Sequence, residues 1–266
     1  MQPANVAQDL VASDAIEILR TCMTQSLTHT QEMREFVTNY LERAGRVVEH
    51  LPGGCVFSPG TREDAIVVVA HMDTVWANRS RTSVIADIDE HEGVWHSRNR
   101  AVGIGADDRS GIGAIFNLLD LGHSVLFTDG EERGMVGSIT LRRSEHQTFE
   151  LLQQHSFMLQ IDRMGVNDFK CYDVGTDDFR DYVQENTGML EPNRSSFTDI
   201  CTLCRDIPGV NVSIGYYNEH SPHEVLVLDE WLHQVQRIRT WLSRPTPRFL
   251  LPQQVTSRAE MFAGGW

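Results

Sequence analysis

The apolar run at residues 65–70, Ala-Ile-Val-Val-Val-Ala, constrains the fold more than any other part of the chain. Four of its six residues are β-branched, and no polar residue interrupts it. A strand with apolar side chains on both faces has to be covered on both faces, as in a parallel sheet between layers of helices. The run therefore predicts a central strand rather than a strand with one solvated face.

Predicted helices and strands alternate along the rest of the chain. Apolar residues at helical spacing predict helices at residues 6–25, 30–43, 109–122, 136–154, 176–187, 198–205 and 226–243. Short apolar segments predict strands at residues 46–51, 54–58, 65–70, 123–127, 157–162, 169–174 and 209–217. Residues 83–97 predict a hairpin that turns near Glu92 and Gly93. This alternation predicts a three-layer α/β/α fold with a mixed, mostly parallel central sheet.

Several local signals mark where these elements begin and end. Thr28 and Gln31 form a possible capping box before the second helix, and Gly122 is a typical stop for the helix that precedes it. Residues 244–266 contain three prolines and end in Gly-Gly-Trp, so we expect an extended or partly disordered tail. Because no linker or internal repeat is visible, we expect one domain over residues 1–266.

The charge and cysteine content exclude some classes of partner. The formal net charge is −14 and Lys170 is the only lysine, so neither nucleic acid nor an anionic membrane is an expected partner. The N-terminus has no signal-peptide pattern, and the apolar runs are too short to span a membrane. The five cysteines form an odd, scattered set, which suits a reducing compartment. We therefore expect a cytoplasmic protein.

Side chains that can bind metal ions follow four of the predicted strands or open a helix. Considered alone, each of these residues could have an ordinary structural role, such as a place in a turn or the cap of a helix. Asp108 in particular can cap the helix that follows it. The set is His71 with Asp73, Asp107 with Asp108, Glu131 with Glu132, Asp162, and His220. Ligands gather at the carboxyl ends of strands in open α/β sheets, so we expect this set to converge there. Histidines mixed with carboxylates suit zinc, or manganese or cobalt.

These motifs together resemble the co-catalytic dizinc exopeptidases, which comprise the zinc aminopeptidase family and the family of peptidase T and carboxypeptidase G. The matching stretches are VVVAHMDTV, GADDRSG, FTDGEERGMVGS, the strand-ending Asp162, and HSPHE at residues 220–224. The resemblance implies two divalent metal ions bridged by Asp107. It implies that His71 and Asp162 complete the site of one ion, and Glu132 and His220 the site of the other.

The resemblance also divides the work between the adjacent glutamates, whose carboxylates would repel each other without a partner. It implies that Glu132 is a ligand and that Glu131 is the general base for a water held between the metals. Asp73 lies two residues after His71, where it would orient the imidazole ring without binding the metal itself. The implied activity is hydrolysis of a peptide or amide bond by an aminopeptidase-like exopeptidase.

Substrate-binding residues are predicted from their places beside the implied ligands. Tyr216 or Tyr217 could stabilise an oxyanion, although a core tyrosine is at least as good a reading for one of them. Arg163 could clamp a substrate carboxylate, or form an ordinary ion pair. Asp199 could line the site, or cap a helix. Cys201 and Cys204 have zinc-like spacing but lack further ligands, so we interpret them as core residues.

The spacing of the motifs favours the compact form of the family. Peptidase T and its relatives usually carry a dimer-forming domain before the final histidine, but only 57 residues separate Asp162 from His220 here. The expected substrate is therefore a small peptide or an acyl-amino acid, with the oligomeric state left open. An N-acyl-amino-acid deacylase and a non-catalytic peptide-binding relative remain alternative readings. A cyclising acyl transferase of the glutaminyl-cyclase kind uses one zinc, and the full ligand set argues against it.

Overall fold

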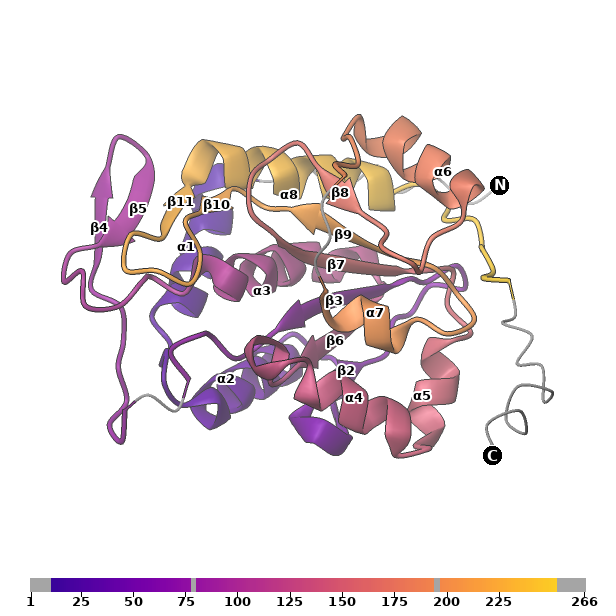
Figure 1. Cartoon of the computed structure of the whole chain (residues 1–266), viewed down its shortest axis with the longest axis horizontal. Helices are drawn as coiled ribbons and strands as arrows, with labels where there is room; N and C mark the ends of the chain where they lie inside the picture. The colour runs from indigo at the N-terminus through magenta and orange to yellow at the C-terminus, as the bar shows by residue number, and fades with distance from the viewer. Residues whose placement is uncertain (1–10, 78–79, 194–196, 253–266) are drawn as a thin grey trace, which may run out of the picture.

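A central sheet of seven strands organises the computed structural model, which describes residues 11–77, 80–193 and 197–252 (Figure 1). The order across the sheet is β1 (Glu49–His50), β2 (Val56–Ser58), β6 (Ser124–Thr128), β3 (Val67–His71), β7 (Met158–Arg163), β9 (Gly209–Ser213) and β8 (Phe169–Lys170). Strands β6, β3, β7 and β9 are parallel, whereas β1, β2 and β8 pair antiparallel at the two edges. The predicted mixed, mostly parallel sheet is confirmed, with the apolar run in the central strand β3.

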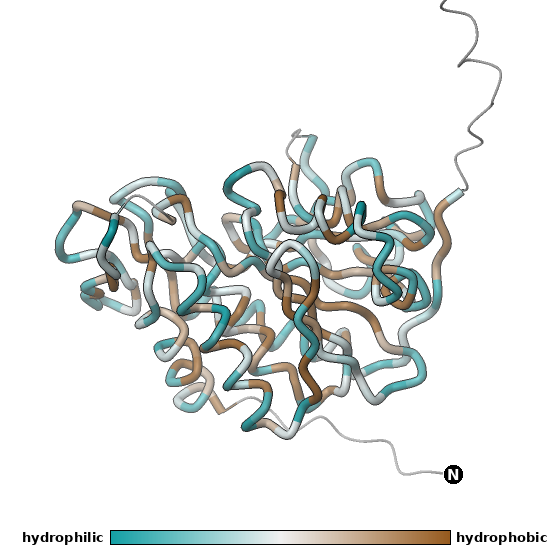
Figure 2. The backbone as a smooth tube through the Cα atoms, turned by 90° about the horizontal axis from the view of Figure 1, so that it is seen from below, coloured by the Kyte–Doolittle hydropathy of each residue, from teal (hydrophilic) through white to brown (hydrophobic). Residues whose placement is uncertain are grey.

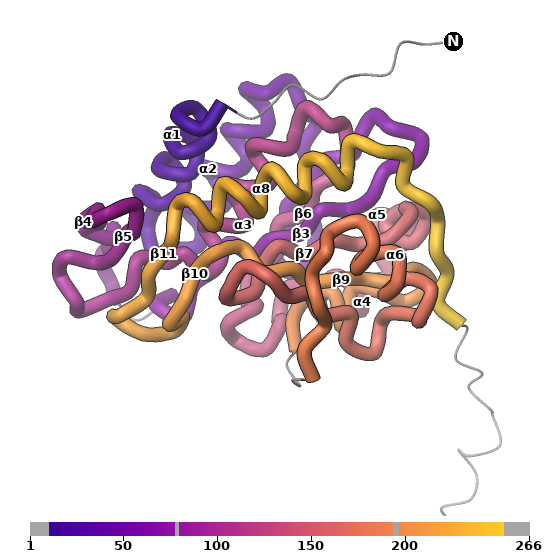
Figure 3. Tube along the Cα trace, turned by 90° about the horizontal axis from the view of Figure 1, so that it is seen from above, coloured from indigo at the N-terminus to yellow at the C-terminus, as the bar shows by residue number. Residues whose placement is uncertain are grey.

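Helices cover both faces of the sheet, as the apolar run requires. Val68 and Ala70 of β3 belong to one core cluster, and Val67 and Val69 belong to another. Helices of the first cluster are α1 (Ala12–Met23), α2 (Thr30–Arg43), α3 (Ala106–Leu118), α6 (Asp177–Thr187) and α8 (Leu228–Leu242). Helices of the second are α4 (Val136–Arg143), α5 (Gln147–Leu152) and α7 (Asp199–Leu203). Figure 2 shows hydrophobic segments running through the middle of the molecule, and Figure 3 shows α8 lying across α3.

A second, antiparallel sheet of four strands lies at one end of the molecule. Its order is β10 (Tyr216–Tyr217), β11 (Val225–Val227), β5 (Val94–Ser97) and β4 (Ile88–His91). The predicted hairpin is β4–β5, and it turns at Glu92 and Gly93, both with positive φ. The predicted strand 209–217 is divided between the two sheets at Gly215, whose φ is 91° and whose Cβ position lies 2.9 Å from the backbone nitrogen of Trp231. This crossing carries residues 218–224 to the carboxyl ends of the central strands.

Several predicted element boundaries differ from the structure. The capping box is wrong, because the Thr28 hydroxyl donates to the carbonyl of Thr82 and accepts from the amide of Val84, so that His29 is the N-cap of α2. The predicted helix 136–154 is divided into α4 and α5, and the predicted strand 169–174 is limited to the two residues of β8. Residues 6–10 of the first predicted helix lie outside the described residues.

The described part of the tail is extended and packed against the body. The amide of Thr246 donates to the carboxylate of Asp64 at 2.8 Å, and the ring of Phe249 lies 5.1 Å from the ring of Phe179. Residues 253–266 lie outside the described residues. All five cysteines are free, and Cys204 is buried in the second core cluster, as expected of a packing residue. Within the described ranges, no helix combines the length and apolar character needed to cross a bilayer.

Candidate metal centre

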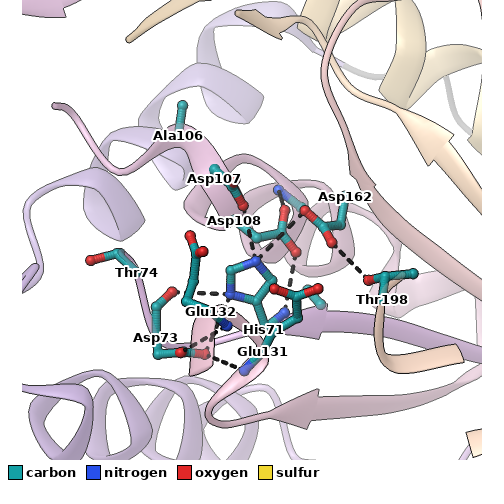
Figure 4. A network of polar contacts seen from close by, with 12 residues as sticks. His71, Asp73, Thr74, Ala106, Asp107, Asp108, Glu131, Glu132, Asp162 and Thr198 are labelled. Atoms are coloured by element: carbon teal, nitrogen blue, oxygen red, sulfur yellow. Dashed lines mark hydrogen bonds and ion pairs between the residues drawn. The ribbon is translucent and has the colours of Figure 1, made fainter. Parts of the chain in front are cut away.

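The side chains predicted to bind metal ions converge at the carboxyl ends of β6, β3 and β7. Figure 4 shows His71, Asp107, Glu132 and Asp162 of this set. His71 ends β3, and Asp162 lies near the end of β7. Glu132 lies in the short 3-10 helix η3 (Glu131–Arg133), which follows β6, and Asp107 lies in the first turn of α3. His220 comes from the turn that follows β10. Residues separated by up to 149 positions in the chain thus meet at one edge of the sheet.

Asp107 lies between the two histidines. Its Oδ1 lies 2.9 Å from Nε2 of His71, and its Oδ2 lies 3.1 Å from Nε2 of His220. The residue is 7% exposed. A carboxylate that offers one oxygen to each of two neighbouring positions has the arrangement that a bridging ligand requires.

Glu132 and Asp162 lie on opposite sides of Asp107, each beside one histidine. Oε2 of Glu132 is 3.0 Å from Nε2 of His220, and Oδ1 of Asp162 is 3.6 Å from Nε2 of His71. Oε1 of Glu132 is buried and has no hydrogen-bond partner among the described residues. The donor atoms of His71, Asp107 and Glu132 all lie within 4.8 Å of one another. Two observations therefore fit a bound metal ion: the side chains are of the types that bind zinc, and one buried carboxylate oxygen lacks a hydrogen-bond partner in the described part of the chain, a place that an ion would fill.

Asp108 also lies close to His71 and Asp162, but its oxygens are engaged by the backbone. Oδ1 accepts a hydrogen bond from the amide of Gly111 at 2.9 Å, and Oδ2 accepts one from the amide of His71 at 3.2 Å. The peptide bond between Asp107 and Asp108 is cis. The N-cap of α3 is Gly105, but Asp107 and Asp108 have non-helical dihedral angles, and the bond from Asp108 to the amide three residues later is the contact that a capping side chain makes. Because both oxygens of Asp108 are engaged, Asp107 is the better candidate ligand.

The charges in the centre favour bound cations. Burial opposes a charged His71 imidazole, but Asp162 and hydrogen bonding to Asp107 outweigh that effect and raise its pKa well above the ordinary value. Hydrogen bonds to Asp107 and Glu132 raise the pKa of His220 to about 11. Burial and the charge of Asp107 raise the pKa of Asp162 to about 6. So many buried carboxylates require positive charge nearby, and divalent ions would supply it.

Glu131 points into a cavity of about 330 Å³ beside the centre, which Asp107, Asp162 and His220 also line. Burial raises the pKa of the Glu131 carboxyl to about 9, with the imidazole of His71 opposing the shift and the carboxylate of Asp162 adding to it. The two adjacent glutamates thus face different surroundings. Glu132 lies against His220, whereas Glu131 lines the cavity.

Asp73 supports the centre in a different way from the one predicted. The backbone carbonyl of Asp73 accepts the hydrogen bond from Nδ1 of His71 at 3.0 Å, while its carboxylate Oδ1 lies 3.5 Å from that nitrogen. The carboxylate instead accepts hydrogen bonds from the amides of Gly130, Glu131 and Glu132 at 2.8, 3.1 and 3.3 Å. It therefore holds the backbone of the segment that presents the two glutamates.

Two of the four predicted substrate-binding residues lie at the cavity. Tyr216 lines it, and its hydroxyl donates to Oδ1 of Asp162 at 3.2 Å. Arg163 lines it as well, but its guanidinium pairs with Asp168 at 2.8 Å and lies 3.5 Å from the hydroxyl of Tyr172. The guanidinium is thus engaged in the ordinary ion pair that was the alternative reading.

The other two predicted substrate-binding residues are absent from the lining of this cavity. The hydroxyl of Tyr217 donates to Glu230 at 2.5 Å, because adjacent residues of β10 face opposite sides of the strand. Asp199 is fully buried, and its carboxylate accepts a hydrogen bond from the hydroxyl of Thr128. Neither Tyr217 nor Asp199 therefore lines the cavity beside the centre, and both side chains are engaged within the protein.

Three supporting residues were missed from the sequence. Gln160 and Thr198 donate to Oδ2 of Asp162 at 2.9 and 3.1 Å, and Glu224 accepts a hydrogen bond from the amide of Asp107 at 3.0 Å. Gln160 lies two residues before Asp162 in β7 and so shares its face, which is a signal that strand periodicity could have supplied. Thr198 has no comparable signal, because its contact depends on the path of the loop before α7.

Several solved structures with the same architecture are described as peptidases, although no protein-family model and no curated protein sequence matches the chain. A tripeptidase from Staphylococcus aureus superposes with a TM-score of 0.69 at 10% identity, over 88% of this chain and 98% of that one. The aminopeptidase PepT from Bacillus cereus gives 0.66 at 12% identity over the same shares of the two chains. The chain has the fold of these peptidases. The TET1 peptidase from Pyrococcus horikoshii shares this peptidase fold with a TM-score of 0.63 at 15% identity, over 85% of this chain and 98% of that one. The resemblance predicted from the motifs is therefore confirmed at the level of the fold.

Proposed function

We propose that the protein is a dimetal hydrolase of peptide or amide bonds that acts as an exopeptidase on small peptides. The observation that carries this proposal is the placement of Asp107, whose two oxygens face His71 and His220 at 2.9 and 3.1 Å. Glu131 lines the cavity beside it, and so does Phe197, whose side chain is 75% exposed. The peptidase fold supports the same reaction class, since three structures that share it are peptidases by their own descriptions.

The proposed ligand set divides into two sites that share Asp107. His71 and Asp162 would hold one ion, and Glu132 and His220 would hold the other. Zinc fits this mixed nitrogen and oxygen set best, and manganese or cobalt also fits it. Two divalent ions, when bound, would polarise the scissile carbonyl and lower the pKa of a water molecule between them.

The side chains around the cavity would then move the protons and fix the substrate. Glu131 would accept a proton from the attacking water at its carboxylate and return it to the leaving amine. The Tyr216 hydroxyl lies on the cavity wall, where it could exchange its hydrogen bond to Asp162 for one to the oxygen of the tetrahedral intermediate. Asp73 would keep Glu131 in place through the backbone.

The function is tested by a substrate panel on metal-free protein reloaded with zinc, manganese or cobalt. The panel contains aminoacyl amides, dipeptides, tripeptides and N-acyl amino acids. Cleavage of substrates with a free amino terminus supports the exopeptidase, whereas cleavage confined to N-acyl amino acids would assign a deacylase. Two bound ions with no turnover of any substrate would instead identify a non-catalytic relative.

The role of Glu131 is tested by the isosteric variant Glu131→Gln. We expect it to keep two metal ions per chain, measured by elemental analysis, and to lose about 10²–10⁴-fold in kcat, the range typical of a general base. Loss of an ion together with activity would make Glu131 a ligand. Glu230→Gln, which removes a carboxylate bonded to Tyr217 away from the cavity lining, is the matched control.

The carboxylate clamp predicted from the sequence at Arg163 has its own test. Arg163→Ala should raise KM for dipeptides more than for the corresponding dipeptide amides if the guanidinium binds the substrate carboxylate. An equal change for both substrate types would show that Arg163 serves only its ion pair with Asp168.

A further inference from the structure

We propose that Glu224 is a positioning residue that fixes Asp107 relative to His220 and thereby sets the affinity of the metal site formed by Asp107, Glu132 and His220. This inference rests on the proposed dimetal function. It concerns a carboxylate that lies outside the predicted ligand set and outside the cavity lining.

Both oxygens of Glu224 bind the backbone that leads into Asp107. Oε2 accepts a hydrogen bond from the amide of Gly105 at 2.7 Å, and Oε1 accepts one from the amide of Asp107 at 3.0 Å. The residue is 2% exposed, so these amides take the place of water around its carboxylate. The side chain thus links the turn that carries His220 to the segment that presents the bridging carboxylate.

The two segments approach so closely that glycine is required between them. A Cβ atom on Gly103 would lie 2.5 Å from Oε2 of Glu224 and 2.7 Å from the carbonyl oxygen of Ser221. The hydroxyl of Ser221 donates to the carbonyl of Asn218 at 2.7 Å, which closes the turn around His220. The turn is therefore fixed by its own hydrogen bonds at one end and by Glu224 at the other.

The two histidines differ in how much they depend on such support. The His71 side chain is 1% exposed and is held by β3, whereas the His220 side chain is 52% exposed and lies on a turn. His220 also has a φ of 62°, a left-handed conformation that few non-glycine residues adopt and that the surrounding turn has to maintain. A change at Glu224 should consequently weaken the site that contains His220 much more than the site that contains His71 and Asp162.

The direct test is a cobalt titration of metal-free Glu224→Gln, followed by visible absorption and by equilibrium dialysis. Glutamine keeps one acceptor oxygen but places an NH₂ group against one of the backbone N–H groups, so that hydrogen bond is replaced by repulsion. We expect the wild-type protein to bind two ions and the variant to bind one of them about 10–100-fold more weakly, the usual effect of losing an outer-shell partner. His220→Ala identifies which binding step belongs to that site, and Asp229→Asn, an exposed carboxylate on α8, is the isosteric control.

A second variant keeps the inference testable if Glu224→Gln does not fold. Gly103→Ala leaves the carboxylate in the chain but forces apart the two segments, so it should weaken the same binding step. Unchanged affinity for both ions in either folded variant, or an equal loss for both ions, would overturn the positioning role. This outcome can be distinguished from a failure of the proposed function. A wild-type protein that binds two ions but cleaves no substrate would contradict the proposed activity without contradicting the role of Glu224.

Discussion

The carboxylate of Asp73 holds the backbone of Glu131, with Oδ1 of Asp73 3.1 Å from the amide nitrogen of Glu131. The same carboxylate binds the amides on either side, so the orientation of the proposed base depends on a residue 58 positions earlier in the chain. The imidazole of His71 depends instead on the backbone carbonyl of Asp73. One residue therefore supports the ligand through its main chain and the base through its side chain.

This division predicts a selective defect in Asp73→Asn. The substitution keeps the carbonyl that orients His71, so both metal ions should be retained. It places an NH₂ group against one of the three amides, so the segment that presents Glu131 should shift and kcat should fall about 10–100-fold. Steady-state kinetics and elemental analysis of the purified variant check both parts. Loss of metal from Asp73→Asn would show that its carboxylate, and not its main chain, supports His71. Asp229→Asn, which changes an exposed carboxylate on α8, is the control.

Removal of the metal ions should lower the stability of the protein. The carboxylates of Asp107, Glu132 and Asp162 are buried together, and bound ions would offset their repulsion. Zinc at one hundred times its Kd should raise the free energy of unfolding by about 2.7 kcal/mol for each site filled. Urea denaturation with and without chelator measures this difference. A zinc effect that persists undiminished in the double variant His71→Ala/His220→Ala would contradict the proposed sites.

His123 predicts a pH dependence of stability that is independent of the metal centre. Its Nδ1 accepts a hydrogen bond from the amide of Ile66 at 3.2 Å, and its Nε2 lies 3.0 Å from the carbonyl oxygen of Leu242, so the folded protein requires the neutral form protonated at Nε2. Burial lowers the pKa of His123 from 6.5 to about 4. The unfolded chain therefore binds the proton first as the pH falls, and the free energy of unfolding should decrease between pH 6.5 and pH 4 by up to about 3 kcal/mol.

The contribution of His123 is isolated by comparison with His123→Asn. The variant should be less stable at pH 7, because it loses a buried hydrogen bond, but its stability should fall less steeply between pH 6.5 and pH 4. Urea denaturation across that range gives the two slopes, and NMR of the imidazole nitrogens identifies the tautomer. Identical slopes for the two proteins would show that His123 does not carry the effect.

The fully buried Arg109 predicts a large effect on stability without a role as ligand. Its Nη1 donates to the carbonyl of Met72 and its Nη2 to the carbonyl of Ser26, both at 2.7 Å, which ties the α1–α2 connection to the end of β3. Arg109→Met would leave both buried carbonyls without donors and should lower the free energy of unfolding by about 2–5 kcal/mol. Urea denaturation measures the loss, with the exposed Arg43→Met as control. A loss below about 1 kcal/mol would show that water replaces the guanidinium.

The sequence predicted the fold class from local burial patterns. The apolar run in β3 indicated burial on both faces, and the structure divides its side chains between two core clusters. Strand periodicity and helical spacing reflect burial within one segment, so they locate the middle of a helix or strand well. They locate its ends less well, because the ends depend on contacts with other segments. Thr28 illustrates why the ends of elements are harder to predict. Its hydroxyl forms a hydrogen bond with a segment 54 residues away, so it does not cap α2 as predicted.

The sequence by itself determined which residue types follow each central strand, and therefore which side chains could meet at the carboxyl edge of the sheet. Only the tertiary structure decided which of two neighbours faces that edge, as with Tyr216 at the cavity and Tyr217 against Glu230. It also decided that Glu224 supports Asp107, a contact across 117 positions. The physical reason is that burial patterns are local properties of a chain, whereas hydrogen-bond partners are set by how distant segments pack against one another.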